Sequence, residues 1–190
     1  MIWWPTEVPT LSHGLITLRP LGESDIPEIY KSCQDPIIPR FTRIPHDYTM
    51  AHAEFFVREK TPTSLIAKTE LAFAIDYGNG TDIQFAGVIS FHSPNLPNHV
   101  AELGYWTNAD VRGKGVGTNA ARIITNYGFE TMGFERIEAL VDVENIASKK
   151  LLASAGYSLE GILRKKSRRH DGHHIDMAMF SIIRDEWKGL

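Results

Sequence analysis

The stretch that decides the fold is Val111-Arg112-Gly113-Lys114-Gly115-Val116-Gly117-Thr118. An alternating apolar segment, residues 100–106, precedes it, and an amphipathic run, residues 116–132, follows it, which predicts a strand, a glycine turn and a helix. The first amides of a helix have no partner within the helix and lie at the positive end of its dipole, so they favour phosphate. The glycines would let a ligand approach the main chain, and Arg112 and Lys114 would add positive charge. We therefore expect a pyrophosphate-binding turn.

The spacing of the glycines excludes two common phosphate-binding motifs. A P-loop needs lysine and then serine or threonine after its last glycine, and neither pair follows here. The dinucleotide fingerprint needs a glycine at position 118, where Thr118 stands. The remaining pattern is R-x-x-G-x-G, formed by Arg112, Gly115 and Gly117. Because this motif is short, a surface turn with chance glycines stays the alternative until the flanking sequence is considered.

The composition is that of a globular protein. The 190 residues are enough for one compact domain, which we place at residues 1–190, and hydrophobic and charged residues make up ordinary shares of 43% and 23%. A net charge of −3 argues against general nucleic-acid binding. Cys33 is the only cysteine, so no internal disulfide can form, and a reducing compartment is the simpler interpretation. The sequence has neither the features of a signal peptide nor an apolar run of membrane-spanning length, and we expect a soluble, cytoplasmic protein.

Hydrophobic periodicity and turn residues divide the chain into strands and helices. Alternation predicts strands at residues 15–19, 71–77, 83–92, 100–107, 136–143, 157–169 and 173–183. Helical spacing and capping residues predict helices at residues 26–33, 49–60, 116–132 and 145–155. Residues 37–48 contain Pro39, Pro45 and Asp47 and are predicted to form a loop. The strand–helix–strand order after residue 100 predicts a right-handed crossover between parallel strands, within a mixed sheet that has helices on both faces.

The segments around the glycine turn resemble the RimJ/RimL-type branch of the GNAT N-acetyltransferases. The similarity lies in Ala101-Glu102-Leu103-Gly104-Tyr105-Trp106, in Asn145-x-x-Ser148, in Gly156-Tyr157-x-x-Glu160-Gly161, and in His174-x-Asp176, Phe180-Ser181 and Glu186-Trp187. The first half matches only through Leu18-Arg19-Pro20 and Pro39-Arg40-Phe41-Thr42. The resemblance implies the GNAT fold, an α/β (α+β) arrangement in which a twisted, mixed but mostly antiparallel sheet of about seven strands carries helices on both faces.

The resemblance also implies acetyl-CoA as the co-substrate. The glycine turn would hold its pyrophosphate, and a backbone N–H near Trp106 and Thr107 would polarise the acetyl carbonyl. The residues implied to contact the cofactor are Trp106, Thr107, Arg112, Gly113, Lys114, Gly115, Val116, Gly117, Thr118, Asn145 and Ser148.

Two side chains are candidates for the proton transfers of acetyl transfer. Glu102 is the candidate general base, through a water, because its strand leads into the turn and its apolar neighbours occupy the opposite face. The alternative for Glu102 is a solvated or salt-bridged carboxylate. Ser148 is the candidate acid for the leaving thiolate and shares a helical face with Asn145, although both could instead cap the helix. Many family members have a tyrosine near the final strand, where this chain has Phe180, which removes one phenolic donor.

Other charged and reactive residues favour less specific roles. No metal site is expected in the cluster of His170, His173, His174 and Asp176, because strand alternation sends sequence neighbours to opposite faces. An exposed edge strand is the interpretation for the basic run Arg164, Lys165, Lys166, Arg168 and Arg169, with nucleic-acid docking as its alternative. Cys33 is predicted to lie in the first helix, away from the turn, so no thiol intermediate is expected.

The sequence therefore favours an acetyl-CoA-dependent N-acetyltransferase that transfers the acetyl group directly to a primary amine, on a protein N-terminus or a small molecule. The acceptor site would be built by residues 37–48 and the second helix, and their sequence does not identify the acceptor. One alternative is a non-catalytic acyl-CoA-binding or regulatory module of the same fold, which would bind CoA and acetylate nothing. Another is an antibiotic or polyamine acetyltransferase. Neither a membrane nor nucleic acid is expected as a partner, and a homodimer is left open.

Overall fold

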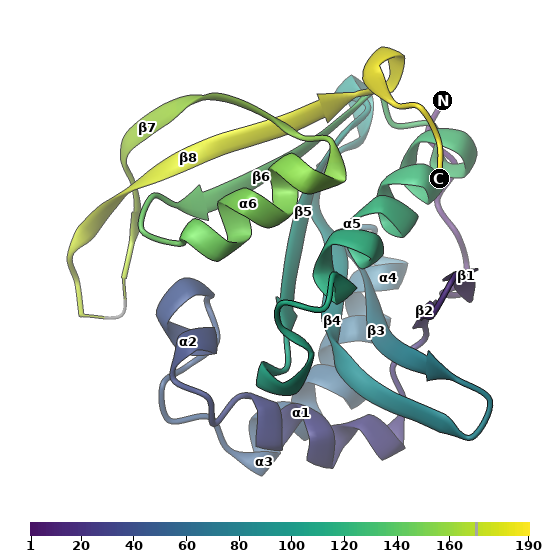
Figure 1. Cartoon of the computed structure of the whole chain (residues 1–190), viewed down its shortest axis with the longest axis vertical. Helices are drawn as coiled ribbons and strands as arrows, with labels where there is room; N and C mark the ends of the chain where they lie inside the picture. The colour runs from purple at the N-terminus through teal and green to yellow at the C-terminus, as the bar shows by residue number, and fades with distance from the viewer. Residues whose placement is uncertain (170) are drawn as a thin grey trace.

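The computed structural model describes residues 1–169 and 171–190, and an eight-stranded sheet runs through them (Figure 1). In spatial order the strands are β1 (Leu11–His13), β2 (Ile16–Arg19), β3 (Glu70–Asn79), β4 (Asp82–Asn95), β5 (Val100–Thr107), β6 (Arg136–Asp142), β8 (His174–Ile183) and β7 (Ser158–Arg168). All neighbouring strands are antiparallel except β5 and β6. The mixed, mostly antiparallel sheet is therefore confirmed. The additional strand is β1, which sequence analysis missed because it is three residues long and little buried.

Helices cover both faces of this sheet. They are α1 (Ile26–Ser32), α2 (Ile37–Phe41), α3 (Met50–Phe55), α4 (Thr61–Ile66), α5 (Val116–Tyr127) and α6 (Ile146–Ala155), with short 3₁₀ or π segments at Glu23–Asp25, Phe56–Lys60, Leu96–Asn98, Ala109–Val111, Gly128–Met132 and Arg184–Glu186. The main core joins α5 and α6 to one face of β5 through buried side chains that include Leu103. A second cluster joins α1, α2 and α3 to the other face, which Trp106 contacts. The expectation of helices on both faces is confirmed.

Two boundaries in the first half differ from the prediction. The loop expected at residues 37–48 is wrong for its first five residues, which form α2. Proline is tolerated in a first helical turn, where the amide has no partner to lose, so Pro39 does not break this helix. The helix expected at residues 49–60 begins as predicted but continues through a π segment and α4 to Ile66. Pro62 again lies in a first turn and allows the continuation.

The two parallel strands at the centre of the sheet separate partway along their length. β5 pairs with β4 from Val100 to Thr107, whereas its pairing with β6 ends at Glu102, opposite Glu138. Figure 1 shows β5 and β6 diverging beyond that point, while β6 remains paired with β8. The edge of β5 formed by residues 103–107 therefore has no neighbouring strand on the β6 side. This opening positions the candidate site.

Candidate functional site

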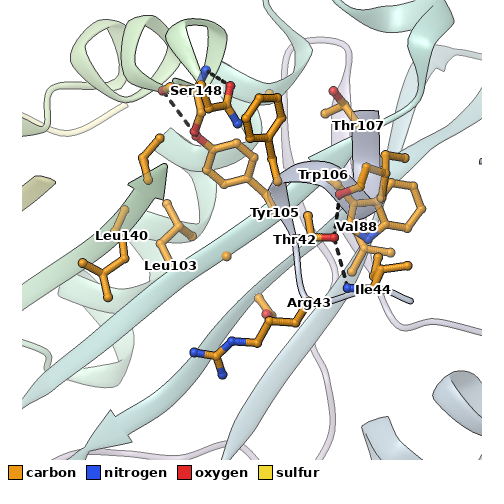
Figure 2. A pocket seen from close by; sticks show the side chains of 18 of the residues that line it. Thr42, Arg43, Ile44, Val88, Leu103, Tyr105, Trp106, Thr107, Leu140 and Ser148 are labelled. Atoms are coloured by element: carbon orange, nitrogen blue, oxygen red, sulfur yellow. Dashed lines mark hydrogen bonds between the residues drawn. The ribbon is translucent and has the colours of Figure 1, made fainter. Parts of the chain in front are cut away.

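A pocket of about 1350 Å³ follows the opening between β5 and β6 (Figure 2). Its walls come from the turn after β5, the start of α6, the segment between α2 and α3, and the facing side chains of the sheet. The predicted site residues that line it are Glu102, Trp106, Thr107, Arg112, Gly113, Gly115, Val116, Gly117, Thr118, Asn145 and Ser148. Lys114 is exposed and does not line the pocket. The tertiary structure thus brings together all the predicted residues except Lys114.

The start of α5 presents backbone N–H groups to this pocket. The first bond of the helical ladder runs from the Asn119 amide to the Gly115 carbonyl at 3.0 Å. Within the described chain, the amides of residues 115–118 donate to no protein acceptor, and all four residues line the pocket. Open amides at the positive end of a helix dipole fit a diphosphate group.

The glycines of the turn also have conformational and packing causes of their own. Gly113 and Gly115 have φ angles of +76° and +77°, in the left-handed region that favours glycine. A Cβ at Gly117 would lie 2.5 Å from Leu151 Cδ1, so this glycine lets α5 approach α6. The sequence suggested that these positions are glycine so that a ligand can approach the main chain. The left-handed backbone and the close helix packing already require glycine there, and ligand approach would be an additional reason.

The guanidinium of Arg112 is held by protein groups. Its Nη1 lies 2.6 Å from Asp35 Oδ2, and its Nη2 donates a hydrogen bond to the Thr107 carbonyl at 2.9 Å. These contacts tie the turn to the segment after α1 and to the end of β5. The full positive charge expected at this position is therefore shared with a carboxylate, and Arg112 fixes the shape of the turn as well as lining the pocket.

The direction of the β5 amides follows from the register with β4. Asn108 donates to the Ala86 carbonyl at 2.8 Å, and alternation along an antiparallel pair therefore turns the Trp106 amide toward β4 as well. The amides of Tyr105 and Thr107 then point the other way, toward the opening that β6 leaves. A backbone N–H near Trp106 and Thr107 was expected to polarise the carbonyl. The Thr107 amide points toward the opening and the Trp106 amide does not, and the Tyr105 amide also points toward the opening.

Glu102 belongs to a row of polar side chains that crosses the sheet. It stands in register with His92 on β4 and Glu138 on β6, and its Oε1 lies 3.9 Å from His92 Nε2. Glu138 is paired with Arg136 Nε at 2.6 Å, whereas Glu102 has no lysine or arginine partner among the described residues. Leu103 is buried on the opposite face, which confirms the predicted alternation. Glu102 therefore forms no salt bridge with a lysine or arginine of the described residues.

Ser148 and Asn145 lie at the start of α6, where the sequence placed them. Asn145 Oδ1 accepts a hydrogen bond from the Ser148 amide at 3.0 Å, so Asn145 caps the helix. Ser148 Oγ lies 2.7 Å from the hydroxyl of Tyr105, a contact drawn in Figure 2. Burial raises the pKa of the Tyr105 phenol above its ordinary value, and the hydrogen bond with Ser148 partly opposes that rise.

Tyr105 is a pocket residue that sequence analysis did not single out. Its phenol contacts Ser148 at the pocket, while Phe180, at the position where a donor was expected from the final strand, is buried in the core. The available signal was strand alternation, since Tyr105 shares a face with Leu103 and therefore points toward the helices α5 and α6. Glu102 and Ser148 reach the pocket from opposite sides of β5.

The described residues form neither a metal site nor a membrane-spanning helix. In residues 1–169 and 171–190 no group of three histidine, cysteine or carboxylate side chains is placed to hold a metal ion. His170, part of the cluster considered in the sequence, lies outside the described residues. None of the described helices is long and apolar enough to span a bilayer.

Comparison with known families and sequences identifies relatives. Residues 16–158 match the family described as "Acetyltransferase (GNAT) domain". The "Uncharacterized N-acetyltransferase p20" of Bacillus licheniformis is 29% identical over 180 residues, covering 95% of this chain and 99% of the relative.

Solved structures show the same fold. RimJ of Mycobacterium smegmatis, in complex with CoA-disulfide, superposes with a TM-score of 0.84 at 21% identity, over 98% of this chain and 92% of RimJ. The microcin C7 self-immunity acetyltransferase MccE, in complex with acetyl-CoA and AMP, gives a TM-score of 0.80 at 25% identity, over 90% of this chain and 93% of that one.

The open amides can be tested by deleting one of them. Thr118→Pro removes an N–H that has no acceptor in the described part of the chain, and proline is tolerated in a first turn. We expect CoA to bind about 10- to 100-fold more weakly, the cost of one hydrogen bond to a charged group. Isothermal titration with CoA measures the change.

Thr118→Ala is the matched control, because it keeps the amide and removes only the side chain. A smaller loss is expected for it than for Thr118→Pro. Equal CoA affinity of wild type and a folded Thr118→Pro protein would show that this amide does not contact the cofactor.

Proposed function

The chain belongs to the GNAT acetyltransferase family, and on that premise we propose that Glu102 and Ser148 serve direct transfer of an acetyl group from acetyl-CoA to a primary amine. The observation that carries the proposal is the set of open amides at residues 115–118, beside the opening in the sheet and in one pocket with both side chains. The diphosphate of coenzyme A fits those amides. Residues 103–107 at the opening also line this pocket, where an extended arm of the cofactor would lie.

Acetyl-CoA supplies the thioester, and the protein must supply a base for the incoming amine. A terminal amine has a pKa near ~8 and a lysine amine near ~10, so much of the acceptor arrives protonated at neutral pH. Glu102 is suited to take that proton, directly or through a water, because it lines the pocket without a lysine or arginine to neutralise it. His92 Nε2 lies 3.9 Å from Glu102 Oε1, beyond hydrogen-bond distance, so it does not engage this carboxylate directly.

The leaving thiolate needs a proton or a hydrogen bond as the carbon–sulfur bond breaks. We assign this role to Ser148, with Tyr105 as its positioning residue. Because the raised pKa keeps the phenol protonated, Tyr105 can donate to Ser148 Oγ across 2.7 Å, which leaves the serine proton free to point into the pocket. This pair replaces the donor that Phe180 cannot provide.

Direct transfer is favoured over a covalent thiol intermediate. Cys33 is buried at the end of α1, and burial raises the pKa of its thiol to about 12. Because the thiolate is the nucleophilic form, this raised pKa disfavours Cys33 as a nucleophile even though the residue lines the pocket. The cytoplasmic location, a single domain over residues 1–190 and a homodimer stay predictions.

Thiol release tests the activity as a whole. The protein is mixed with acetyl-CoA and a panel of peptides, polyamines and aminoglycosides, and free CoA thiol is measured over time. We expect at least one amine to release thiol in step with its acetylation. CoA binding without turnover of any amine would instead support the non-catalytic module considered from the sequence.

Glu102→Gln tests the base. We expect turnover to fall by about 100-fold at neutral pH, within the range of general-base catalysis, with CoA affinity kept. The loss should shrink as pH rises, because more of the acceptor then arrives deprotonated. Glu138→Gln is the matched control one strand away, outside the pocket, and should keep the wild-type rate. An unchanged pH–rate profile for Glu102→Gln would exclude this glutamate as the base.

A double-mutant cycle tests the Tyr105–Ser148 pair. Ser148→Ala should lower kcat by about 10- to 100-fold, and Tyr105→Phe by less. The double variant should be no slower than Ser148→Ala, because the phenol acts through the serine. Losses that multiply would show that Tyr105 acts independently, and wild-type kcat for Ser148→Ala would remove both from the mechanism.

A further inference from the structure

The part of the pocket on the α2–α3 side, where the acceptor amine must enter, is rich in positive charge. Its cationic side chains are Arg40, Arg43, Lys60, Lys166, Arg168 and Arg169. Its carboxylates are Glu70, Glu102 and Asp142. The chain as a whole has a net charge of −3, so this excess of cations is local.

Three of the cations are already paired with carboxylates. Lys60 Nζ lies 2.8 Å from Glu70, and Arg169 Nη2 lies 2.7 Å from Asp142. Arg40 reaches Glu144 at 3.4 Å. Arg40 and Arg169 thereby connect α2 and the end of β7 to the segment before α6, and Lys60 connects the segment Phe56–Lys60 to β3. The charges of these pairs largely cancel.

The remaining cations have no such partner. Arg43, Lys166 and Arg168 form no ion pair with any residue in the described ranges, and the Arg168 guanidinium donates only to the Gly172 carbonyl. Of the three carboxylates that line this part of the pocket, Glu102, the proposed base, is the one without a lysine or arginine partner among the described residues. The acceptor side of the pocket therefore carries an excess of positive charge that Glu102 offsets only in part.

The backbone around Arg43 is fixed by side-chain hydrogen bonds of its neighbour Thr42. Thr42 Oγ1 donates to the Ile38 carbonyl at 2.7 Å and accepts from the Ile44 amide at 3.2 Å, so the main chain on both sides of Arg43 is held. Figure 2 shows the Arg43 side chain extended within the pocket, with its guanidinium turned away from Thr42 and Ile44. An arginine presented in this way offers a planar fork to a carboxylate or phosphate.

We propose that the acceptor is a primary amine that also carries an anionic group, and that Arg43 binds this group while the amine faces Glu102. This inference rests on the proposed acetyltransferase function and adds the class of acceptor. Lys166 and Arg168 attract the same anion from the β7 side of the pocket. A polyamine acceptor would bring several positive charges to a surface that already repels them. The anion is a phosphate or carboxylate on a small amine, or an acidic side chain near a peptide N-terminus.

Pairs of acceptors that differ in charge test the proposal by thiol release. O-phosphoethanolamine is compared with ethanolamine, a peptide beginning Ser-Glu with one beginning Ser-Gln, and spermidine is included. We expect the anionic member of at least one pair to react with a kcat/KM about tenfold higher, a preference that falls with added salt. The pair that shows it identifies the source of the anion.

Substitutions at Arg43 then assign the preference. Arg43→Gln should raise KM for the anionic acceptor about tenfold and leave the neutral member unchanged, and Arg43→Glu should shift the preference toward spermidine. Arg164→Gln is the matched control, because this exposed arginine belongs to the same basic run as Lys166 but does not line the pocket. It should keep the wild-type preference.

Two results would overturn the proposal while leaving the acetyltransferase function in place. One is a wild-type preference for spermidine or for the neutral members, and the other is an equal loss for both members in Arg43→Gln. If no amine released thiol, the proposed function would fail instead. The anion site would then be judged by NMR titration of O-phosphoethanolamine, and equal affinity of wild type and Arg43→Gln would reject it.

Discussion

The early end of pairing between β5 and β6 is the constraint on which the rest of this structure depends. Parallel strands normally satisfy each other's backbone groups along their length, so ending the ladder at Glu102 leaves the β5 edge of residues 103–107 without a strand neighbour. The antiparallel pairs β4–β5 and β6–β8 keep both strands in place on either side. The sheet can therefore stay open at its centre without losing its core, and the turn to α5 begins where the opening is widest (Figure 1).

The geometry of the turn serves the packing of the helices and leaves backbone amides open to the pocket. Left-handed backbone at Gly113 and Gly115 directs the chain into α5, and the absence of a side chain at Gly117 lets α6 pack closely. The same geometry leaves the amides of residues 115–118 facing the pocket. Arg112 is held by Asp35 and by the Thr107 carbonyl, so it stabilises the turn from the side of α1. A bound diphosphate would satisfy groups that the fold itself does not.

Charge distinguishes the pocket residues from their neighbours in the sheet. Glu70 and Glu138 occupy the same polar row as Glu102, yet each has a lysine or arginine partner, whereas Glu102 has none within the described residues and lies beside His92. The reverse holds for Arg43, which like Lys166 and Arg168 has no carboxylate partner in the described ranges, whereas Arg40 and Arg169 do. A carboxylate and several cations without ion-pair partners among the described residues, together in one pocket, suit an acceptor that carries charges of both signs.

The sequence by itself determined the strand–turn–helix unit, the capped start of α6 and the side of β5 that Glu102 faces, because these features depend on residues close together in the chain. It could not reveal α2, since its prolines resemble those of a loop, nor β1, which forms only against β2. The Tyr105–Ser148 hydrogen bond and the Arg112–Asp35 ion pair join residues that are distant in sequence. The lack of an ion-pair partner for Arg43 among the described residues likewise depends on which side chains fold near it. Only the tertiary structure decided them, because hydrogen bonds and ion pairs depend on side chains meeting in space.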